Sequence, residues 1–150
     1  MITKPFMCVL LALCAFEVSA QTSAPACVTL EQGWVRLPPV AMPMAAGYAR
    51  IRNDCRNEVV VIGAGSRAFA EVSLHETTLV QGISRMREIE RLPIAAGASV
   101  ELKPGGLHLM LMRPEVQLKD GAQLPLRLSL EDGRKIDGML QVRGAAPARP

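Results

Sequence analysis

Four side chains that can bind a soft metal ion are spaced along this sequence, and they include both of its histidines. In order they are His75, Met86, His108 and Met110, separated by ten, twenty-one and one residues. Imidazole nitrogens and thioether sulfurs are neutral donors, and thioethers favour Cu(I) over the hard cations that prefer oxygen. The set therefore predicts a site for a soft metal ion, and copper in particular.

The last two of these residues lie in the segment LHLMLM, which alternates in polarity. Side chains two residues apart on a strand share a face, so His108, Met110 and Met112 are expected on one face and the leucines on the other. The spacing of His108 and Met110 therefore suits one ion. Met112 is either a spare ligand or, as we prefer, a side chain that packs over the site.

The first two ligands are expected on a hairpin. The segments 69–80 and 83–89 both have the character of strands, and Gln81-Gly82 between them is a turn sequence. Folding at this turn would bring His75 and Met86 together, with His75 on the less apolar face. Met42 and Met44 precede a strand centred on Tyr48 and are expected in a proline-containing loop. That loop either caps the site or supplies auxiliary copper ligands.

The remaining pattern predicts an all-β fold. No segment has a sustained helical period, and Met139 is expected in the core. Seven to nine short strands, with turns every eight to twelve residues, are typical of an antiparallel Greek-key β-sandwich. Outside the segments already named, strands are expected at 28–36, near 48–52, at 58–64, after Ala96-Gly97, at 124–130 and at 136–142.

The N-terminus is predicted to be a secretory signal peptide of residues 1–20. Lys4 is followed by the uncharged apolar run 6–16, and small residues end the segment, so cleavage is expected near Ala20. The run is shorter than the roughly 20 residues that span a bilayer, so no stable membrane insertion is expected afterwards. A lipoprotein anchored at Cys14 is the alternative, although Leu13 precedes it where a small residue is usual. The copper-binding domain is expected at 21–143 and a disordered tail at 144–150.

Charge and cysteine content narrow the function classes. The net charge is +3, and no basic run is interleaved with aromatic residues, so nucleic-acid binding is not expected. Cys27 and Cys55 remain after signal cleavage. Two cysteines in an exported domain usually form a disulfide, and metal binding by the two thiols is the alternative.

The four-ligand spacing, together with VSLHET and ELKPGGLHLMLM, resembles the periplasmic copper chaperone family PCuAC, over nearly the whole exported domain. The resemblance implies a cupredoxin-like β-sandwich that holds one Cu(I) through His75, Met86, His108 and Met110. It also implies delivery of copper to the CuA centre of cytochrome c oxidase, alongside Sco-type thiol proteins. The tail GAAPARP lacks the His and Met found in the C-terminal extension of many members, which argues against a Cu(II) site there.

Other functions fit the sequence less well. A blue-copper electron carrier needs a thiolate beside two histidines, and no cysteine lies near either histidine. A catalytic zinc site needs three nitrogen or oxygen ligands and a base, so an enzyme is not expected. A metal-free periplasmic interaction module and a copper storage or tolerance protein remain as alternatives. The protein is expected to act as a monomer.

Overall fold

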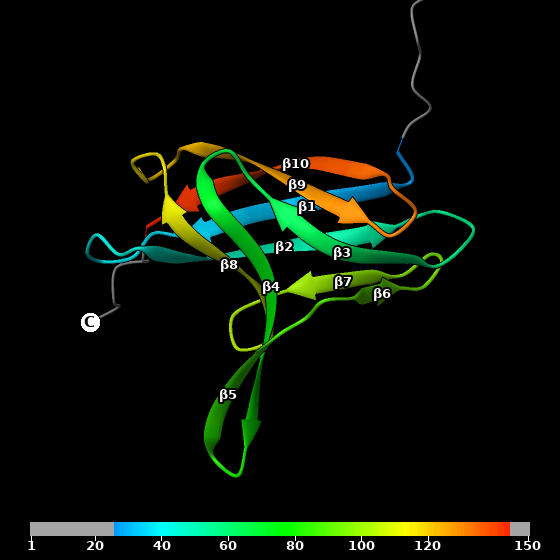
Figure 1. Cartoon of the computed structure of the whole chain (residues 1–150), viewed down its shortest axis with the longest axis horizontal. Coiled ribbons are helices and arrows are strands. Elements are labelled where there is room, and N and C mark those ends of the chain that lie inside the picture. The colour runs from blue at the N-terminus through cyan, green and yellow to red at the C-terminus, as the bar shows by residue number, and fades with distance from the viewer. Residues whose placement is uncertain (1–25, 145–150) are drawn as a thin grey trace, which may run out of the picture.

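The computed structural model describes residues 26–144, which form ten β-strands and no helix (Figure 1). The predicted signal peptide, and the tail beyond Gly144, lie outside these residues. No helix in the described part is long and apolar enough to cross a membrane. The strands are β1 Val28–Arg36, β2 Met44–Asn53, β3 Val59–Gly65, β4 Phe69–Val80, β5 Ile83–Glu88, β6 Leu92–Ile94, β7 Ser99–Leu102, β8 Leu107–Pro114, β9 Gln123–Leu130 and β10 Lys135–Arg143.

The strands form one continuous sheet in the order β5-β4-β8-β2-β1-β10-β9-β3-β6, with β7 paired to β2 beyond the end of β8. The sheet folds over so that its two halves enclose the core, which confirms the predicted all-β sandwich. The one departure from an antiparallel arrangement is the pair β1–β10, which is parallel. This pair joins the first and last strands, so it closes the fold without a local connection.

The core follows from alternation along the strands. Leu109 and Leu111 of β8 and Leu74 of β4 are buried, while the residues between them face outward. The same parity overturns the prediction for Met139, which is 49% exposed. Its neighbour Leu140 is fully buried, and adjacent residues of a strand point to opposite faces.

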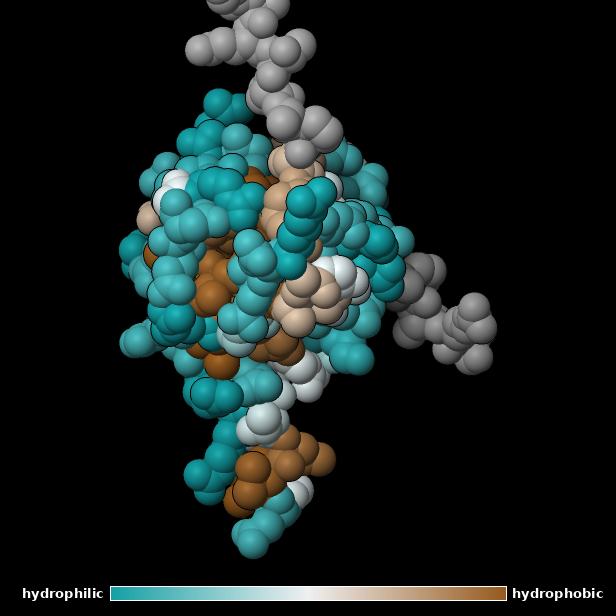
Figure 2. Space-filling view, turned by 90° about the vertical axis from the view of Figure 1, so that its right-hand side faces the viewer, coloured by the Kyte–Doolittle hydropathy of each residue, from teal (hydrophilic) through white to brown (hydrophobic). Residues whose placement is uncertain are grey.

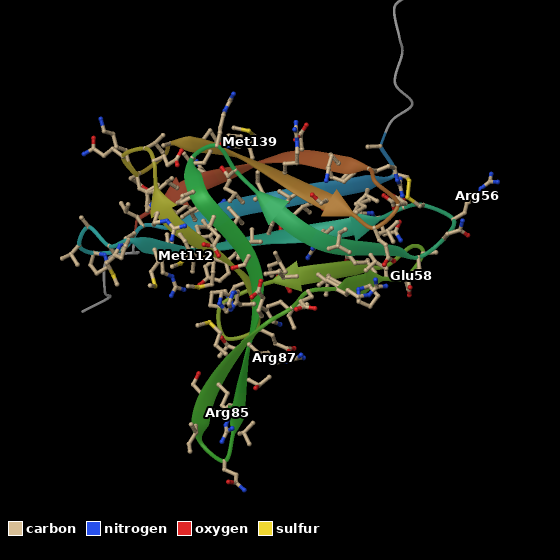
Figure 3. All side chains as sticks on the ribbon, in the orientation of Figure 1. Arg56, Glu58, Arg85, Arg87, Met112 and Met139 are labelled. Atoms are coloured by element: carbon tan, nitrogen blue, oxygen red, sulfur yellow. A yellow bond between two sulfur atoms is a disulfide. The ribbon has the colours of Figure 1, made fainter. Side chains whose placement is uncertain are left out.

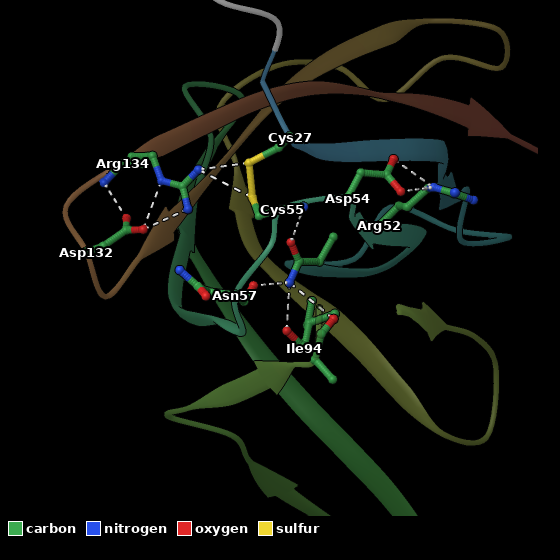
Figure 4. Close-up of a disulfide and its surroundings, with 10 residues drawn as sticks. Cys27, Arg52, Asp54, Cys55, Asn57, Ile94, Asp132 and Arg134 are labelled. Atoms are coloured by element: carbon green, nitrogen blue, oxygen red, sulfur yellow. Dashed lines mark hydrogen bonds and ion pairs between the residues drawn. A yellow bond between two sulfur atoms is a disulfide. The ribbon is translucent and has the colours of Figure 1, made fainter. Parts of the chain in front are cut away.

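A disulfide between Cys27 and Cys55 fastens the start of β1 to the turn after β2, with 4.9 Å between the Cα atoms (Figure 4). Beside it, the fully buried Asn53 donates from Nδ2 to the carbonyl oxygens of Asn57 and Ile94, and its Oδ1 accepts from the backbone N–H of Cys55. This end of the sandwich is therefore held by both a covalent and a polar network.

The β4–β5 hairpin projects from the body of the sandwich (Figure 1). Its turn has positive φ at both central positions, 52° at Gln81 and 78° at Gly82, as a two-residue type I′ turn requires. Figure 2 shows apolar side chains gathered at its tip, where Leu79, Val80 and Ile83 are 75%, 45% and 59% exposed. The hairpin thus carries one end of the candidate site out into solvent.

Candidate metal centre

Strand register places the four predicted ligands on one outer face of β5, β4 and β8. His75 of β4 pairs with His108 of β8, and the next outward position on β8 is Met110. On the other side of β4, Met86 of β5 pairs with Thr77. Side chains of directly paired residues point to the same side of a sheet and lie close together. The two histidine rings are 6.0 Å apart, centroid to centroid.

His108 is held in one orientation by the turn that precedes β8. The residue is 7% exposed, and its Nδ1 lies 2.9 Å from the carbonyl oxygen of Gly106. A carbonyl can only accept, so Nδ1 carries the proton and donates it. The other nitrogen, Nε2, then has a free lone pair, and it lies 3.2 Å from the sulfur of Met86. Two electron-pair donors therefore face each other with no proton between them.

His75 is held by its own strand. Its Nε2 lies 3.0 Å from the hydroxyl oxygen of Ser73, two residues earlier on the same face. Its Nδ1 is the one buried side-chain nitrogen or oxygen in residues 26–144 without a hydrogen-bond partner. Buried polar atoms are rarely left unpartnered, and such an exception is a recognised mark of a binding site. The Nδ1 atom of His75 thus has the character of a free ligand.

The two methionines differ in their surroundings. Met110 is half-buried and lies between the small side chains of Ser73 on β4 and Ala46 on β2, which leave its thioether room to bend. Met86 is 54% exposed on β5, an edge strand of the sheet. The face therefore runs from a buried imidazole to a thioether in contact with solvent.

The three auxiliary methionines are not equivalent. Met44 is the first residue of β2 and pairs with Met112 of β8, so the prediction that it belongs to a loop is wrong. This pairing makes β2 begin at Met44, four residues before Tyr48, because the small alanines between them fit against β8. Met42 does lie in the preceding loop, 45% exposed, where it lines a hollow of about 620 Å³ between residues 37–43 and 113–118. Figure 3 shows Met112 near the end of β8 and Met139 on a different side of the molecule.

Two groups that support the site were not singled out from the sequence. Ser73 could have been found, because it shares the strand face of His75 at a spacing of two. The carbonyl of Gly106 could not, because its direction depends on how the Lys103-Pro104-Gly105-Gly106 turn folds. That carbonyl also accepts from the backbone N–H of Thr77 at 3.0 Å, which ties the turn to β4.

The site differs in kind from the usual clusters of ionisable ligands. Within residues 26–144, no group of three or more His, Cys, Asp or Glu side chains is placed to hold a metal ion. Glu88 is the charged residue paired with His75 across β4 and β5, and it is exposed. The candidate centre therefore consists of two imidazoles and two thioethers at the surface of a sheet.

These features define a cupredoxin-like β-sandwich with a histidine and methionine face, and comparison with known proteins places the chain in a family. It belongs to the LpqE-like family, described as "Putative lipoprotein LpqE-like", whose model matches residues 28–142. A relative from Leifsonia xyli, "Putative lipoprotein Lxx21020", is 31% identical over 80% of this chain and 74% of its own length. An uncharacterised protein of Rickettsia prowazekii, RP573, is 25% identical over 73% of this chain and 62% of its own length.

Solved structures of PCuAC domains have the same fold. The copper-bound PCuAC domain of PmoF2 is similar with a TM-score of 0.66 and 20% identity, over 82% of this chain and 97% of that one. The Cu(I) form of DR1885 from Deinococcus radiodurans has a TM-score of 0.65 and 25% identity, over 87% of both chains. The family's description as lipoproteins is consistent with a location outside the cytoplasm.

Proposed function

We propose that this protein is a copper chaperone that binds one Cu(I) through His75, Met86, His108 and Met110 and passes it to a cuproprotein. The observation that carries the proposal is the contact between Nε2 of His108 and the sulfur of Met86 at 3.2 Å. Because neither atom has a proton to donate to the other, the contact is best explained as two ligands arranged to bind the same cation. His75 would bind through Nδ1, the buried nitrogen without a partner.

The ligand set suits a copper site in an oxidising compartment. Thioethers and imidazoles avoid the disulfide formation that threatens a thiolate site. All four donors are neutral, so the loaded site keeps a single positive charge, and soft sulfur donors favour Cu(I) over Cu(II). Ser73 and the Gly106 carbonyl orient the imidazoles through their second nitrogens, as outer partners do in metal sites.

Release is proposed to begin at the methionines. Met86 is 54% exposed on an edge strand, whereas His108 is 7% exposed between two neighbouring strands. An incoming ligand can therefore replace the Met86 thioether first, Met110 next and the histidines last. Equal transfer rates to an acceptor from Met86→Ala and His75→Ala proteins would contradict this order.

The proposed location and recipient rest on the predicted signal peptide and on the resemblance of the sequence to the PCuAC family. Export through a signal peptide cleaved near Ala20 would deliver a monomeric domain, closed by the Cys27–Cys55 disulfide, to the periplasm. The proposed recipient is the subunit of cytochrome c oxidase that carries the CuA centre, with a Sco-type thiol protein as a second participant. Binding and transfer, not catalysis, are the proposed activity.

Competition for Cu(I) against a chromophoric chelator tests the central proposal. The unmodified protein should hold one Cu(I), and His108→Ala combined with Met110→Ala should abolish tight binding. Met86→Ala is the companion variant, since its exposed position leaves the fold intact, and Met139→Ala is the matched control. Unchanged affinity in both ligand variants would refute the site and leave the domain as an interaction module.

A further inference from the structure

A second group of thioethers continues the outer face beyond the proposed copper site. The β2–β8 register pairs Met44 with Met112 and Ala46 with Met110. Directly paired side chains have Cβ atoms about 4.5–5.5 Å apart, and diagonal neighbours about 7–8 Å apart, which long side chains can bridge. Three methionine sulfurs, those of Met44, Met110 and Met112, can therefore reach one point above the β2–β8 pair.

The local backbone fixes this neighbourhood. Near the end of β8, Arg113 has a positive φ of 49°, and its backbone N–H donates to the carbonyl oxygen of Pro43 at 2.6 Å. The Arg113 guanidinium also forms an ion pair with Glu71 at 3.3 Å. Glu71 lies on β4, where it pairs with Met112 of β8. The end of β8 is thus tied both to the residue before Met44 and to the strand on its other side.

These methionines are not needed to complete the core. Met44 is 37% exposed, Met112 is half-buried, and neither belongs to the cluster of core residues or to the side chains packed against it. The Arg113 guanidinium is already neutralised by Glu71, so it does not repel a cation strongly. An outward group of thioethers without a packing role is suited to a soft monovalent cation.

From this arrangement we infer that Met44 and Met112 form a second, weaker site for Cu(I) or Ag(I), with Met110 as a ligand shared with the first site. The inference rests on the proposed function, because Met110 is given a role in both sites. An ion arriving at this all-thioether site could pass through Met110 to the histidines without entering water. Having no imidazole, the second site should bind less tightly and exchange faster than the first.

Titration of the full exported chain with Ag(I), followed by NMR of methionine methyl carbons and histidine ring nitrogens, separates the two sites. Ag(I) is soft and monovalent and does not change oxidation state during the titration. The first equivalent should shift the signals of His75, His108 and Met86. The second should shift Met44 and Met112, with Met110 responding in both stages and Met139 in neither.

The decisive variant replaces Met44 and Met112 by leucine, which conserves volume at these positions. Affinity for the first equivalent should stay within about twofold, while affinity for the second should fall at least tenfold. Met139→Leu, at a similarly exposed position, is the control and should change neither. A second equivalent that binds unaltered in the double variant, or that shifts Met42 instead of Met112, overturns the inference. Failure at the first equivalent alone refutes the proposed function instead.

Discussion

Replacing Met86 by leucine should leave the metal-free protein as stable as before and remove about a third of its stabilisation by copper. Met86 is 54% exposed on an edge strand, so the substitution should change the free energy of unfolding by no more than about 0.5 kcal/mol. The same substitution removes one of four proposed ligands. We therefore expect a small effect on the fold and a large effect on Cu(I) binding.

The size of both effects follows from the length of the ordered chain. Residues 26–144, about 120 in all, imply an unfolding entropy of about 0.25 kcal/mol per kelvin. Free Cu(I) at about a thousand times Kd adds about 4 kcal/mol, which raises Tm by about 16 °C. A loss of one ligand that weakens binding tenfold removes about 1.4 kcal/mol, or about 5–6 °C of that shift. The metal-free Tm should move by about 2 °C or less.

Thermal unfolding in a Cu(I) buffer is the assay, with ascorbate as reductant so that the Cys27–Cys55 disulfide stays intact. The control is Met139→Leu, which removes an exposed thioether on another part of the molecule. If Met86→Leu and Met139→Leu show the same copper-induced rise in Tm, Met86 is not a ligand. The contact between its sulfur and His108 would then be packing.

Three further predictions concern the hairpin tip, the disulfide and the loss of folding stability at acid pH. Leu79→Ser should slow copper transfer to an acceptor protein without changing Cu(I) affinity, on the hypothesis that the acceptor docks on the apolar hairpin tip, where this side chain is 75% exposed; equal transfer rates would argue against docking there. Replacing Cys27 and Cys55 by alanine should cost about 3–4 kcal/mol in chemical denaturation, given a sequence separation of 28; a loss under 1 kcal/mol would contradict the loop-entropy estimate. The Arg134 guanidinium lowers the pKa of Asp132, so the stability this carboxylate adds is present above about pH 4 and is lost as pH falls through the lowered pKa. Asp132→Asn should therefore lose less stability than the unmodified protein between pH 5 and pH 2.5, and parallel losses would refute the assignment.

The sequence predicted strands better than register. Period-two alternation located β4 and β8, and the turn sequence Gln81-Gly82 located the hairpin, because these signals are local. Met44 was misplaced in a loop because Pro43, which precedes it, lacks a backbone N–H. That lack interrupts a strand only where the neighbouring strand needs a donor, and here Pro43 instead accepts, through its carbonyl oxygen, from the backbone N–H of Arg113. Met139 was misplaced in the core because nothing in the nearby sequence distinguishes a single outward-facing apolar residue from its buried neighbours.

The arrangement of the site could be only half anticipated, since alternation gives a face but not a partner. Parity put His108 and Met110 on one side of β8, yet a slip of one residue between β4 and β8 would turn one histidine away from the other. The actual register, His75 opposite His108, is fixed by the leucines on the inner face: Leu74 pairs with Leu109 in the core. The packing of the apolar inner face thus determines the geometry of the outer face, which carries the histidines and methionines.

The same sheet order explains why binding and release need not compete. The histidines lie on β4 and β8, each paired on both sides, so their backbones are held by the whole sandwich. Met86 lies on β5, which is paired on one side only and projects into solvent (Figure 1). Separation of β5 from β4 can therefore withdraw one thioether while the two imidazoles keep their positions. If that is how copper leaves, a disulfide that staples β5 to β4 at Thr78→Cys and Arg85→Cys, a directly paired position, should slow transfer more than it changes affinity. Equal slowing in a Thr78→Ser, Arg85→Ser variant, which cannot form the staple, would show that separation of β5 from β4 is not the step that limits release.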